Sequence, residues 1–362
     1  MRRFSFVLAA LAVVGAANSS HAAEKLGLKK GDVKLQSAGP IAFGPDSILF
    51  VADPKAATVY AIDTGDAVGK RPFAEVKVDG LEKQAKDIGG QDAKVIDLAV
   101  NPLSGSVFVS IGGSQPAIAK VAGGKLTKVE LSGVANSSAT LPNPPADKEE
   151  QTQRGPRNNR NDSITDLAFI DGHVIASGLA TAGGKNGSSV QDMPFPFDKK
   201  TDVANLEIYH AAHGRLEDNA VIRAFIPFNI DGKPHLLAGF QCTPLVKFPI
   251  SAVDDGQKVK GTTVAELGNM NRPLDMVAYE KDGEMFVLIA NDRRGVMKVS
   301  TKDIDKNPGL TEPVRGGGTA GQSFEKIDEL TGTVQLDKLD DSRAVIVVDT
   351  KGELTLKTIT LP

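Results

Sequence analysis

Residues 41–63 read IAFGPDSILFVADPKAATVYAID, and the prediction of the fold starts from this stretch. It contains three short runs, 41–43, 48–53 and 59–63, that are rich in β-branched and aromatic residues. The turn Gly44-Pro45-Asp46 separates the first two runs, and a polar loop separates the second and third. Runs of this kind, bounded by turn residues, are typical of short antiparallel strands. The stretch therefore predicts a three-stranded meander.

The same order of runs and turns returns along the chain. Five further copies lie at 96–121, 165–177, 223–250, 274–300 and 334–359. One such meander cannot bury both of its faces and must stack against its neighbours. The sequence therefore predicts an all-β fold, a β-propeller with six blades of four-stranded antiparallel sheet. The last copy shows three runs, so we expect the N-terminal run 32–35 to complete the final blade and close the ring. A pair of β-sandwich domains is the alternative, because sandwich strands share this pattern.

Composition excludes several classes of protein. The 362 residues carry 42 Lys and Arg against 45 Asp and Glu, which argues against a nucleic-acid partner because phosphates require a basic surface. The absence of Trp and the presence of only 3 Tyr disfavour a base-stacking platform. A single cysteine, Cys242, excludes an internal disulfide and also the zinc-ribbon, CxxC redox and c-type haem attachment motifs, each of which needs at least two cysteines. No nucleotide, haem or iron–sulfur cofactor is expected.

The N-terminus has the layout of a secretory signal peptide. Arg2 and Arg3 precede an apolar stretch at 4–17, and Ser20-His21-Ala22 resembles a cleavage site. We expect residues 1–22 to be removed and the protein to be periplasmic or secreted, with no membrane span; an uncleaved signal anchor is the alternative. Residues 23–362 are then expected to form one propeller domain with loop insertions at 133–162 and 182–204.

Residues 41–53 and 59–63 resemble a blade of the NHL, SMP-30/gluconolactonase and YVTN group of propellers. Blades of that group commonly read apolar-Ala-apolar, a turn with Asp, apolar-Tyr/Phe-Val-Ala-Asp, a loop and a final apolar-x-x-Ile-Asp. Residues 94–122 and 271–300 match this pattern more loosely. The resemblance implies an architecture that lactonases, lyases, sensors and protein-binding scaffolds share, and fold alone does not assign function.

Alignment of the copies predicts the residues that line the central channel. The register places one residue per blade at the start of the innermost strand: Pro40, Asp97, Asp166, Arg223, Asp275 and Gln335. Carboxylate oxygens suit Ca²⁺ or another hard divalent cation, and the resemblance to SMP-30-like enzymes implies a divalent ion at such a place. The alternative is that each Asp accepts hydrogen bonds from backbone amides of the adjacent turn.

Two loops are candidates for the mouth of the channel. Asn291, in the loop 291–295, could add an oxygen ligand to the three aspartates, and Arg293 and Arg294 could hold an anionic ligand; an ordinary solvated turn is the alternative. Phe195 and Phe197 lie between prolines in the second insertion and could contact a ligand or partner. Packing against the side of the propeller is the alternative for these two residues.

His210 and His213 suggest a second kind of metal site. A spacing of three places two side chains on opposite sides of a strand, so joint chelation requires a turn within the motif. With the Cys242 thiolate, the two imidazoles would suit zinc or copper.

The sequence thus predicts an exported scaffold that binds a small molecule or a protein through its channel mouth and the loops around it. The alternative is a divalent-metal-dependent, SMP-30/lactonase-like hydrolase that uses Asp97, Asp166, Asp275 and Asn291 as ligands and a metal-activated water as nucleophile.

Overall fold

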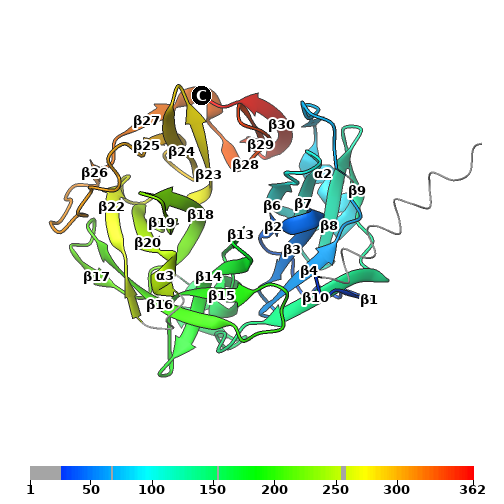
Figure 1. Ribbon diagram of the computed structural model, residues 1–362, viewed down its shortest axis with the longest axis horizontal. Helices are drawn as coiled ribbons and strands as arrows, with labels where there is room; N and C mark the ends of the chain where they lie inside the picture. Colours follow the sequence, from blue (N-terminus) through cyan, green and yellow to red (C-terminus); the bar gives the residue numbers. More distant parts are fainter. Residues whose placement is uncertain (1–25, 67, 153–154, 254–257) are drawn as a thin grey trace, which may run out of the picture.

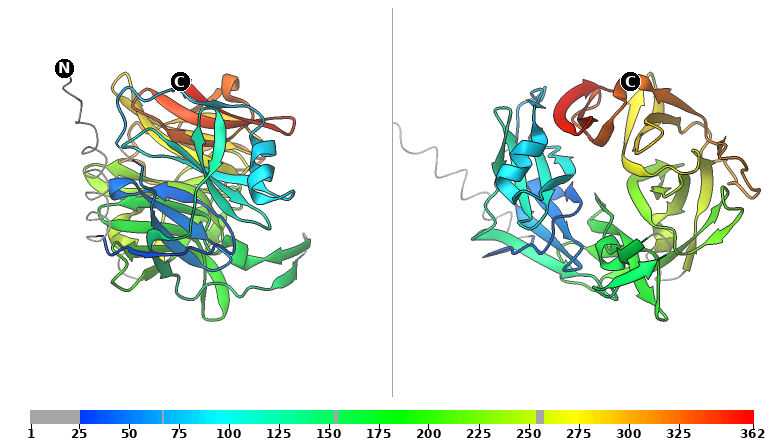
Figure 2. Two further views of the ribbon diagram at one scale, coloured as in Figure 1. Left: turned by 90° about the vertical axis from the view of Figure 1, so that its right-hand side faces the viewer. Right: turned by 180° about the vertical axis from the view of Figure 1, so that it is seen from behind.

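The computed structural model describes residues 26–66, 68–152, 155–253 and 258–362. Six antiparallel sheets stand as blades around a central channel (Figures 1 and 2), so the prediction of a six-bladed β-propeller is confirmed. The expected signal peptide, 1–22, lies outside the described residues. Within the described ranges, no helix combines the length and the apolar content that crossing a bilayer requires.

The blades are numbered by the chain order of their innermost strands, and the strands of each blade follow from the channel outward. Blade 1 consists of β2 (Ile41–Phe43), β3 (Ile48–Asp53), β4 (Thr58–Asp63), β10 (Val134–Thr140) and β1 (Lys29–Gly31). Blade 2 consists of β6 (Lys94–Val100), β7 (Val107–Gly112), β8 (Ala117–Ala122) and β9 (Lys125–Lys128). Blade 3 consists of β13 (Asp166–Ile170), β14 (His173–Ala182), β15 (Lys185–Pro194), β16 (Asp202–His210) and β17 (Arg215–Glu217), with β21 (Lys258–Lys260) parallel to β16.

The remaining three blades follow the same plan. Blade 4 consists of β18 (Ile222–Ile230), β19 (Lys233–Phe240), β20 (Pro244–Pro249), β22 (Thr262–Glu266) and β26 (Ala320–Gly321). Blade 5 consists of β23 (Pro273–Lys281), β24 (Glu284–Asn291), β25 (Val296–Ser300) and β27 (Phe324–Ile327). Blade 6 consists of β28 (Thr333–Lys338), β29 (Arg343–Thr350), β30 (Glu353–Thr360) and β5 (Lys77–Val78).

Asp-Gly pairs make the tight turns between the inner strands of several blades. Asp231 and Gly232 join β18 to β19 with φ angles of 51° and 72°, and Asp282 and Gly283 join β23 to β24 with φ angles of 53° and 79°. Two consecutive positive φ values define the hairpin turn whose twist matches the flanking strands, and Asp-Gly is a preferred sequence for it. These pairs were therefore reliable strand-end signals in the sequence.

The blades do not follow one another around the ring in chain order. Neighbouring innermost strands contact each other in the order β2, β13, β18, β23, β28, β6 and back to β2. Blade 2 consequently lies between blades 6 and 1 (Figure 1). From β4 the chain runs to β5 on the outer edge of blade 6, passes through helix α2 (Leu81–Gly89) and forms blade 2. It then returns as β10 to blade 1 before it enters blade 3.

The prediction that residues 32–35 complete the last blade was wrong. Residues 32–35 do not join blade 6; the Val33 N–H donates to the Leu131 carbonyl oxygen at 2.8 Å, and Val33 packs into the core between blades 1 and 2. The strand that completes blade 6 is β5, in which Val78 pairs with Leu356. The reason is the ring order, because the chain leaves blade 1 along the outer edge of blade 6 on its way to blade 2.

Each of the six interfaces between blades has its own hydrophobic cluster. Phe50 lies at the interface between blades 1 and 3, and Val345 lies with Val109 at the interface between blades 6 and 2. Helix α2 buries Leu81 and Ala85 in this last cluster. At about 25 cal/mol per Å² of apolar surface, such contacts supply the main force that holds independent meanders in one ring.

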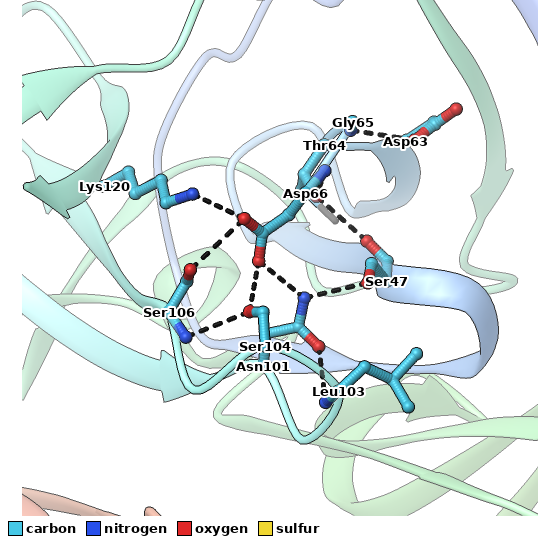
Figure 3. Close-up of polar contacts among 10 residues, drawn as sticks. All are labelled: Ser47, Asp63, Thr64, Gly65, Asp66, Asn101, Leu103, Ser104, Ser106 and Lys120. Atoms are coloured by element: carbon cyan, nitrogen blue, oxygen red, sulfur yellow. Dashed lines mark hydrogen bonds and ion pairs between the residues drawn. The ribbon is translucent and has the colours of Figure 1, made fainter. Parts of the chain in front are cut away.

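A polar cluster also joins blade 1 to blade 2 (Figure 3). The Asp66 carboxylate, in the chain after β4, accepts hydrogen bonds from Lys120 Nζ at 2.5 Å, from Asn101 Nδ2 at 2.8 Å and from the Ser104 and Ser106 hydroxyls. Burial raises the pKa of Asp66, but the bonds from Lys120, Ser104 and Asn101 outweigh burial and lower it below its usual value. The cluster fixes blade 2 beside blade 1.

The two expected insertions are largely strands. Most of 182–204 forms β15 and the start of β16, and 133–162 contributes β10, the separate hairpin of β11 (Glu149–Thr152) with β12 (Gly155–Asn158), and the 3-10 turn η2 (Asn159–Asp162). The buried residues of β15 include Ser188, Ser189 and Gln191. Because these buried side chains are polar, the strand lacks the alternating apolar pattern that identifies strands in a sequence.

Candidate functional site

The starts of all six innermost strands line one cavity of about 570 Å³ at the channel mouth, which we call the channel cavity. The face on which it opens is called the upper face. The lining includes every residue that the blade alignment placed there: Pro40, Asp97, Asp166, Arg223, Asp275 and Gln335. A second cavity of about 460 Å³ occupies the other half of the channel. Asp97, Asp166 and Asp275 line both cavities and therefore form the waist between them.

The three waist aspartates share one hydrogen-bonding arrangement. In each, Oδ1 accepts from the N–H of the next residue, at 2.7–2.8 Å. In each, Oδ2 accepts from the innermost strand of a neighbouring blade: Asp97 from Ile41 at 2.9 Å, Asp166 from Phe225 at 2.6 Å, and Asp275 from Leu336 at 2.8 Å. The carboxylates therefore connect blades as well as line the channel.

Asp337 of blade 6 repeats this arrangement deeper in the channel. Its Oδ1 accepts from the Lys338 N–H and its Oδ2 from the Val100 N–H of blade 2, both at 2.7 Å. It lines the second cavity only. The sequence-based prediction missed Asp337 because it counted one residue per blade, at the start of each innermost strand, and Asp337 lies further along.

The channel raises the pKa of all four carboxyl groups. Burial raises the pKa of Asp97 to about 7, although N–H bonds from Ile41 and Leu98 oppose it and the charge of Asp337 adds to it. Burial, and then the charge of Asp97, raise the pKa of Asp166 and Asp275 well above the ordinary value. Burial raises the pKa of Asp337 to about 6. All four groups therefore keep a proton to higher pH than an ordinary carboxyl group does.

The expected calcium ligands do not form a compact group. Among the described residues, the cluster of three or more Asp, Glu, His or Cys donors within 4.8 Å of one another does not include Asp97, Asp166 or Asp275. Asn291 lines a different cavity, of about 620 Å³, which we call the side cavity. Its Oδ1 accepts from Asn271 Nδ2 at 3.0 Å, so Asn291 stabilises its own turn. The three aspartates do accept backbone N–H bonds, as in the arrangement that the sequence left as the alternative.

Arg223 reaches the channel cavity from blade 4 and forms an ion pair. Its Nη1 lies 2.7 Å from Asp162 Oδ1, and both side chains are 17% exposed. Its Nη2 lies 3.4 Å from Gln241 Oε1. The Nε atom is buried without a hydrogen-bond partner among the described residues. Asp162 also pairs with Arg157 at 2.6 Å, so the hairpin β11–β12 is tied to the cavity wall.

Arg272, which the sequence pattern did not single out, lies where the channel cavity meets the side cavity. Its backbone N–H donates to Asp292 Oδ1 at 2.8 Å, and its exposed guanidinium has no partner in the described part of the chain. Arg293 lines the side cavity. The guanidinium of Arg294, which the sequence also offered for an anionic ligand, donates to the carbonyl oxygens of Asn269 and Gly317.

The two phenylalanines expected to contact a ligand belong to the core instead. Phe195 is 9% exposed and packs in the cluster between blades 1 and 3, where its ring meets Phe50 edge to face at 5.0 Å. Phe197 packs partly buried against Phe195, with ring centroids 5.2 Å apart. Neither residue lines the channel cavity. Aromatic rings flanked by prolines looked exposed in the sequence, but the chain just after β15 packs them against blade 1.

His210, His213 and Cys242 come together on the upper face, at the boundary of blades 3 and 4. His210 ends β16, and the turn 211–214 returns the chain into β17, with the His213 N–H donating to the His210 carbonyl at 3.0 Å. This is the turn that joint chelation requires. Glu217, on β17, accepts from both imidazoles and was not selected from the sequence.

Comparisons with known proteins identify no family for this chain. No family model matches the sequence, and no curated protein matches it. Among solved structures, the plexin A4 extracellular region aligns over 90% of this chain at 7% identity with a TM-score of 0.44; the chain spans 39% of that protein's length. A PQQ-bound aldose sugar dehydrogenase from Streptomyces coelicolor aligns over 91% of this chain and 97% of its own at 13% identity and a TM-score of 0.38. Drosophila Semaphorin 1b aligns over 93% of this chain and 88% of its own at 10% identity and a TM-score of 0.40. At these scores the alignments carry no argument about function.

Proposed function

We propose that this protein is a binding propeller whose channel cavity takes a small anionic molecule that carries hydroxyl groups. The observation that carries the proposal is the guanidinium of Arg272, unpaired within the described part of the chain, at the rim of a polar cavity that all six blades line. A volume of about 570 Å³ lies within the usual range of small-ligand sites. The proposal narrows the sequence-based expectation of a scaffold for a small ligand or a protein partner.

The charges in the cavity support an anionic ligand near neutral pH. The charged groups that line it are Asp97, Asp162, Asp166, Asp275, Arg223 and Arg272. Arg223 and Asp162 neutralise each other, and the raised pKa values of Asp97, Asp166 and Asp275 reduce the negative charge that these three carboxyls carry near neutral pH. Arg272 then supplies the remaining positive charge, since guanidinium groups bind carboxylates and phosphates with two parallel hydrogen bonds. Neutral carboxyl groups can donate or accept hydrogen bonds to ligand hydroxyls.

The hydrolase alternative requires a divalent ion at the waist of the channel. The waist carboxylates each accept two backbone N–H bonds and are absent from the compact donor group of the described residues. The blade pattern at 41–63 resembles that of the gluconolactonase group, so the experiment below also measures hydrolysis of lactones. The binding proposal needs no metal ion and is the better supported of the two.

The test is a titration of the purified protein with gluconate, citrate and, as a neutral comparison, glucose. We expect the anions to bind and to raise the melting temperature, and binding to weaken as pH rises from 6 to 8.5 because the aspartates ionise. Arg272→Met should reduce affinity at least tenfold, whereas Arg293→Met, in the side cavity, is the matched control. Equal binding of glucose, or unchanged affinity in Arg272→Met, would contradict the proposal. Calcium-dependent hydrolysis of a lactone panel would favour the alternative.

A further inference from the structure

Three potential metal ligands meet on the upper face, outside the channel cavity. His210 and His213 come from blade 3, and Cys242 lies in the turn between β19 and β20 of blade 4. One nitrogen of each imidazole and the Cys242 Sγ all lie within 4.8 Å of one another. None of these three residues lines the channel cavity. Two separate segments of the sequence therefore bring two imidazole nitrogens and a thiol sulfur close together.

Glu217 orients both imidazole rings. Its Oε2 lies 2.7 Å from His210 Nδ1, and its Oε1 lies 2.9 Å from His213 Nδ1. The ring centroids are 3.8 Å apart, and Arg215 Nε donates to the same carboxylate at 2.9 Å. A histidine that binds a metal through one nitrogen commonly donates its other N–H to a carboxylate. With both Nδ1 atoms directed at Glu217, the Nε2 atoms are the ones free to bind a metal.

A buried nitrogen of His210 is a second, independent observation that points to a metal ion at this cluster. Its side chain is 2% exposed, and its Nε2 atom is buried without a hydrogen-bond partner among the described residues. Buried polar atoms in folded proteins almost always have a partner. A bound metal ion would supply one.

The two halves of the cluster are also held together without a metal. Glu266, at the end of β22 in blade 4, accepts through Oε1 from the Ala212 N–H at 3.0 Å. Ala212 lies in the turn between the two histidines, so blade 4 fixes the position of that turn. The Cys242 N–H donates to the Asn271 carbonyl at 2.8 Å, which fixes the third donor. The donors are thereby positioned before a metal binds.

We propose that His210, His213 and Cys242 form a binding site for a thiophilic late transition-metal ion, for which Zn²⁺ is the reference. Two imidazoles and a thiolate suit zinc or copper and disfavour calcium and magnesium, which take oxygen ligands. Zinc bonds of about 2.1 Å to nitrogen and 2.3 Å to sulfur place tetrahedral ligand atoms roughly 3.3–3.7 Å apart. The three donor atoms already lie within 4.8 Å of one another, and they would move closer together as the ion binds. Binding releases the thiol proton, and the site is independent of the proposed ligand in the channel.

The test uses the full chain after treatment with a chelator. Calorimetric titration with Zn²⁺ should give one tight site per chain, and Co²⁺ should give a thiolate-to-cobalt charge-transfer band. Cys242→Ser and His213→Gln should each lower zinc affinity at least 100-fold, and Cys242→Ser should abolish the band. Glu217→Gln should weaken binding about 10–100-fold because it removes the orienting carboxylate. His235→Gln is the matched control, since His235 bonds the Lys233 carbonyl and lies outside the cluster.

The variants separate loss of the site from loss of the fold. His213 is 42% exposed, so His213→Gln is expected to keep the circular dichroism spectrum and melting temperature of the metal-free protein. Zn²⁺ should raise the melting temperature of the unaltered chain and leave that of His213→Gln unchanged. Unaltered zinc affinity in both His213→Gln and Cys242→Ser, or a cobalt complex without the charge-transfer band, would overturn the proposal. Copper binding that depends on the same residues would support it.

Discussion

The Asp97 Oδ2 atom accepts a hydrogen bond from the Ile41 N–H at 2.9 Å, although 56 residues separate the two in the chain. Asp97 belongs to the innermost strand of blade 2, and Ile41 to that of blade 1. Equivalent hydrogen bonds are accepted by three further aspartates. Asp166 joins blade 3 to blade 4, Asp275 joins blade 5 to blade 6, and Asp337 joins blade 6 to blade 2. The carboxylates that shape the channel therefore also hold the ring together, and their protonation links its stability to pH.

Stability should fall as pH rises from about 4 to 7. A carboxyl whose folded pKa is raised binds a proton in the folded state at pH values where the unfolded chain has lost it, so raising the pH favours unfolding. The window runs from the ordinary value of 3.8 to about 6 for Asp337 and about 7 for Asp97. Urea unfolding at pH 5 and pH 8 should give the higher midpoint at pH 5.

Asp97→Asn should reduce that pH dependence. The asparagine amide can accept only one of the two backbone N–H bonds that Asp97 now accepts, which should cost about 1–3 kcal/mol at pH 5. At pH 8 the loss should be smaller, because the variant no longer carries the ionised group. The exposed Asp198 provides the control, Asp198→Asn. A cost that is equal at both pH values would contradict the link to protonation.

The closing strand of the ring offers a second prediction. Val78, in β5, is fully buried and pairs with Leu356 on the outer edge of blade 6. Val78→Asp should destabilise the protein by more than about 3 kcal/mol, because a charge would enter the core without a partner. Val68, earlier in the same connection, is 76% exposed, so Val68→Asp should leave the urea midpoint nearly unchanged. Equal midpoints for the two variants would show that β5 does not close the ring.

The blade count and the lining of the channel could be predicted because both follow from local signals. The meander at 41–63 and the Asp-Gly turns recur along the chain, and alignment of the copies brings Asp97, Asp166 and Asp275 to one level of the ring. The order of the blades could not be predicted this way. It depends on two edge strands. β5 follows blade 1 in the chain but pairs with blade 6, and β10 follows blade 2 in the chain but pairs with blade 1.

The functions of individual side chains were harder to predict than their positions. Arg294 and Asn291 have the chemistry of ligand-binding groups, but backbone carbonyls and a neighbouring amide occupy them in the folded chain. The contact of Glu217 with both histidines could not be predicted from the sequence, because it depends on how the turn 211–214 folds. A single sequence identifies donors and acceptors, whereas tertiary pairing decides which of them remain free.

The aromatic pair Phe195 and Phe197 should act on stability and not on ligand binding. Phe195→Ala should cost about 3–5 kcal/mol, as is usual when a buried phenylalanine is truncated, because it removes the ring that meets Phe50. Phe197→Ala should cost less, since Phe197 is only partly buried. Urea unfolding measures both losses, and titration of the folded Phe197→Ala protein with gluconate should give the affinity of the unaltered chain. Lost ligand affinity without lost stability would restore the role expected from the sequence.

Asp66 should show a pH dependence opposite to that of Asp97. Its pKa is lowered by the donors around it, so its contribution to stability is complete above its ordinary value of 3.8 and is lost as pH falls through the lowered folded value. Asp66→Asn should therefore cost on the order of 3 kcal/mol at pH 7, because the partly buried pairing with Lys120 is broken, and the cost should shrink toward pH 3. Lys120→Met should cost less, since Asn101 and the two serines still donate to Asp66. Asp63→Asn, at the end of β4, is the control, because among the described residues the Asp63 carboxylate accepts only a local bond, from the Gly65 N–H. A cost for Asp66→Asn that grows as the pH falls would show that the carboxylate does not fix blade 2 beside blade 1 through its charge.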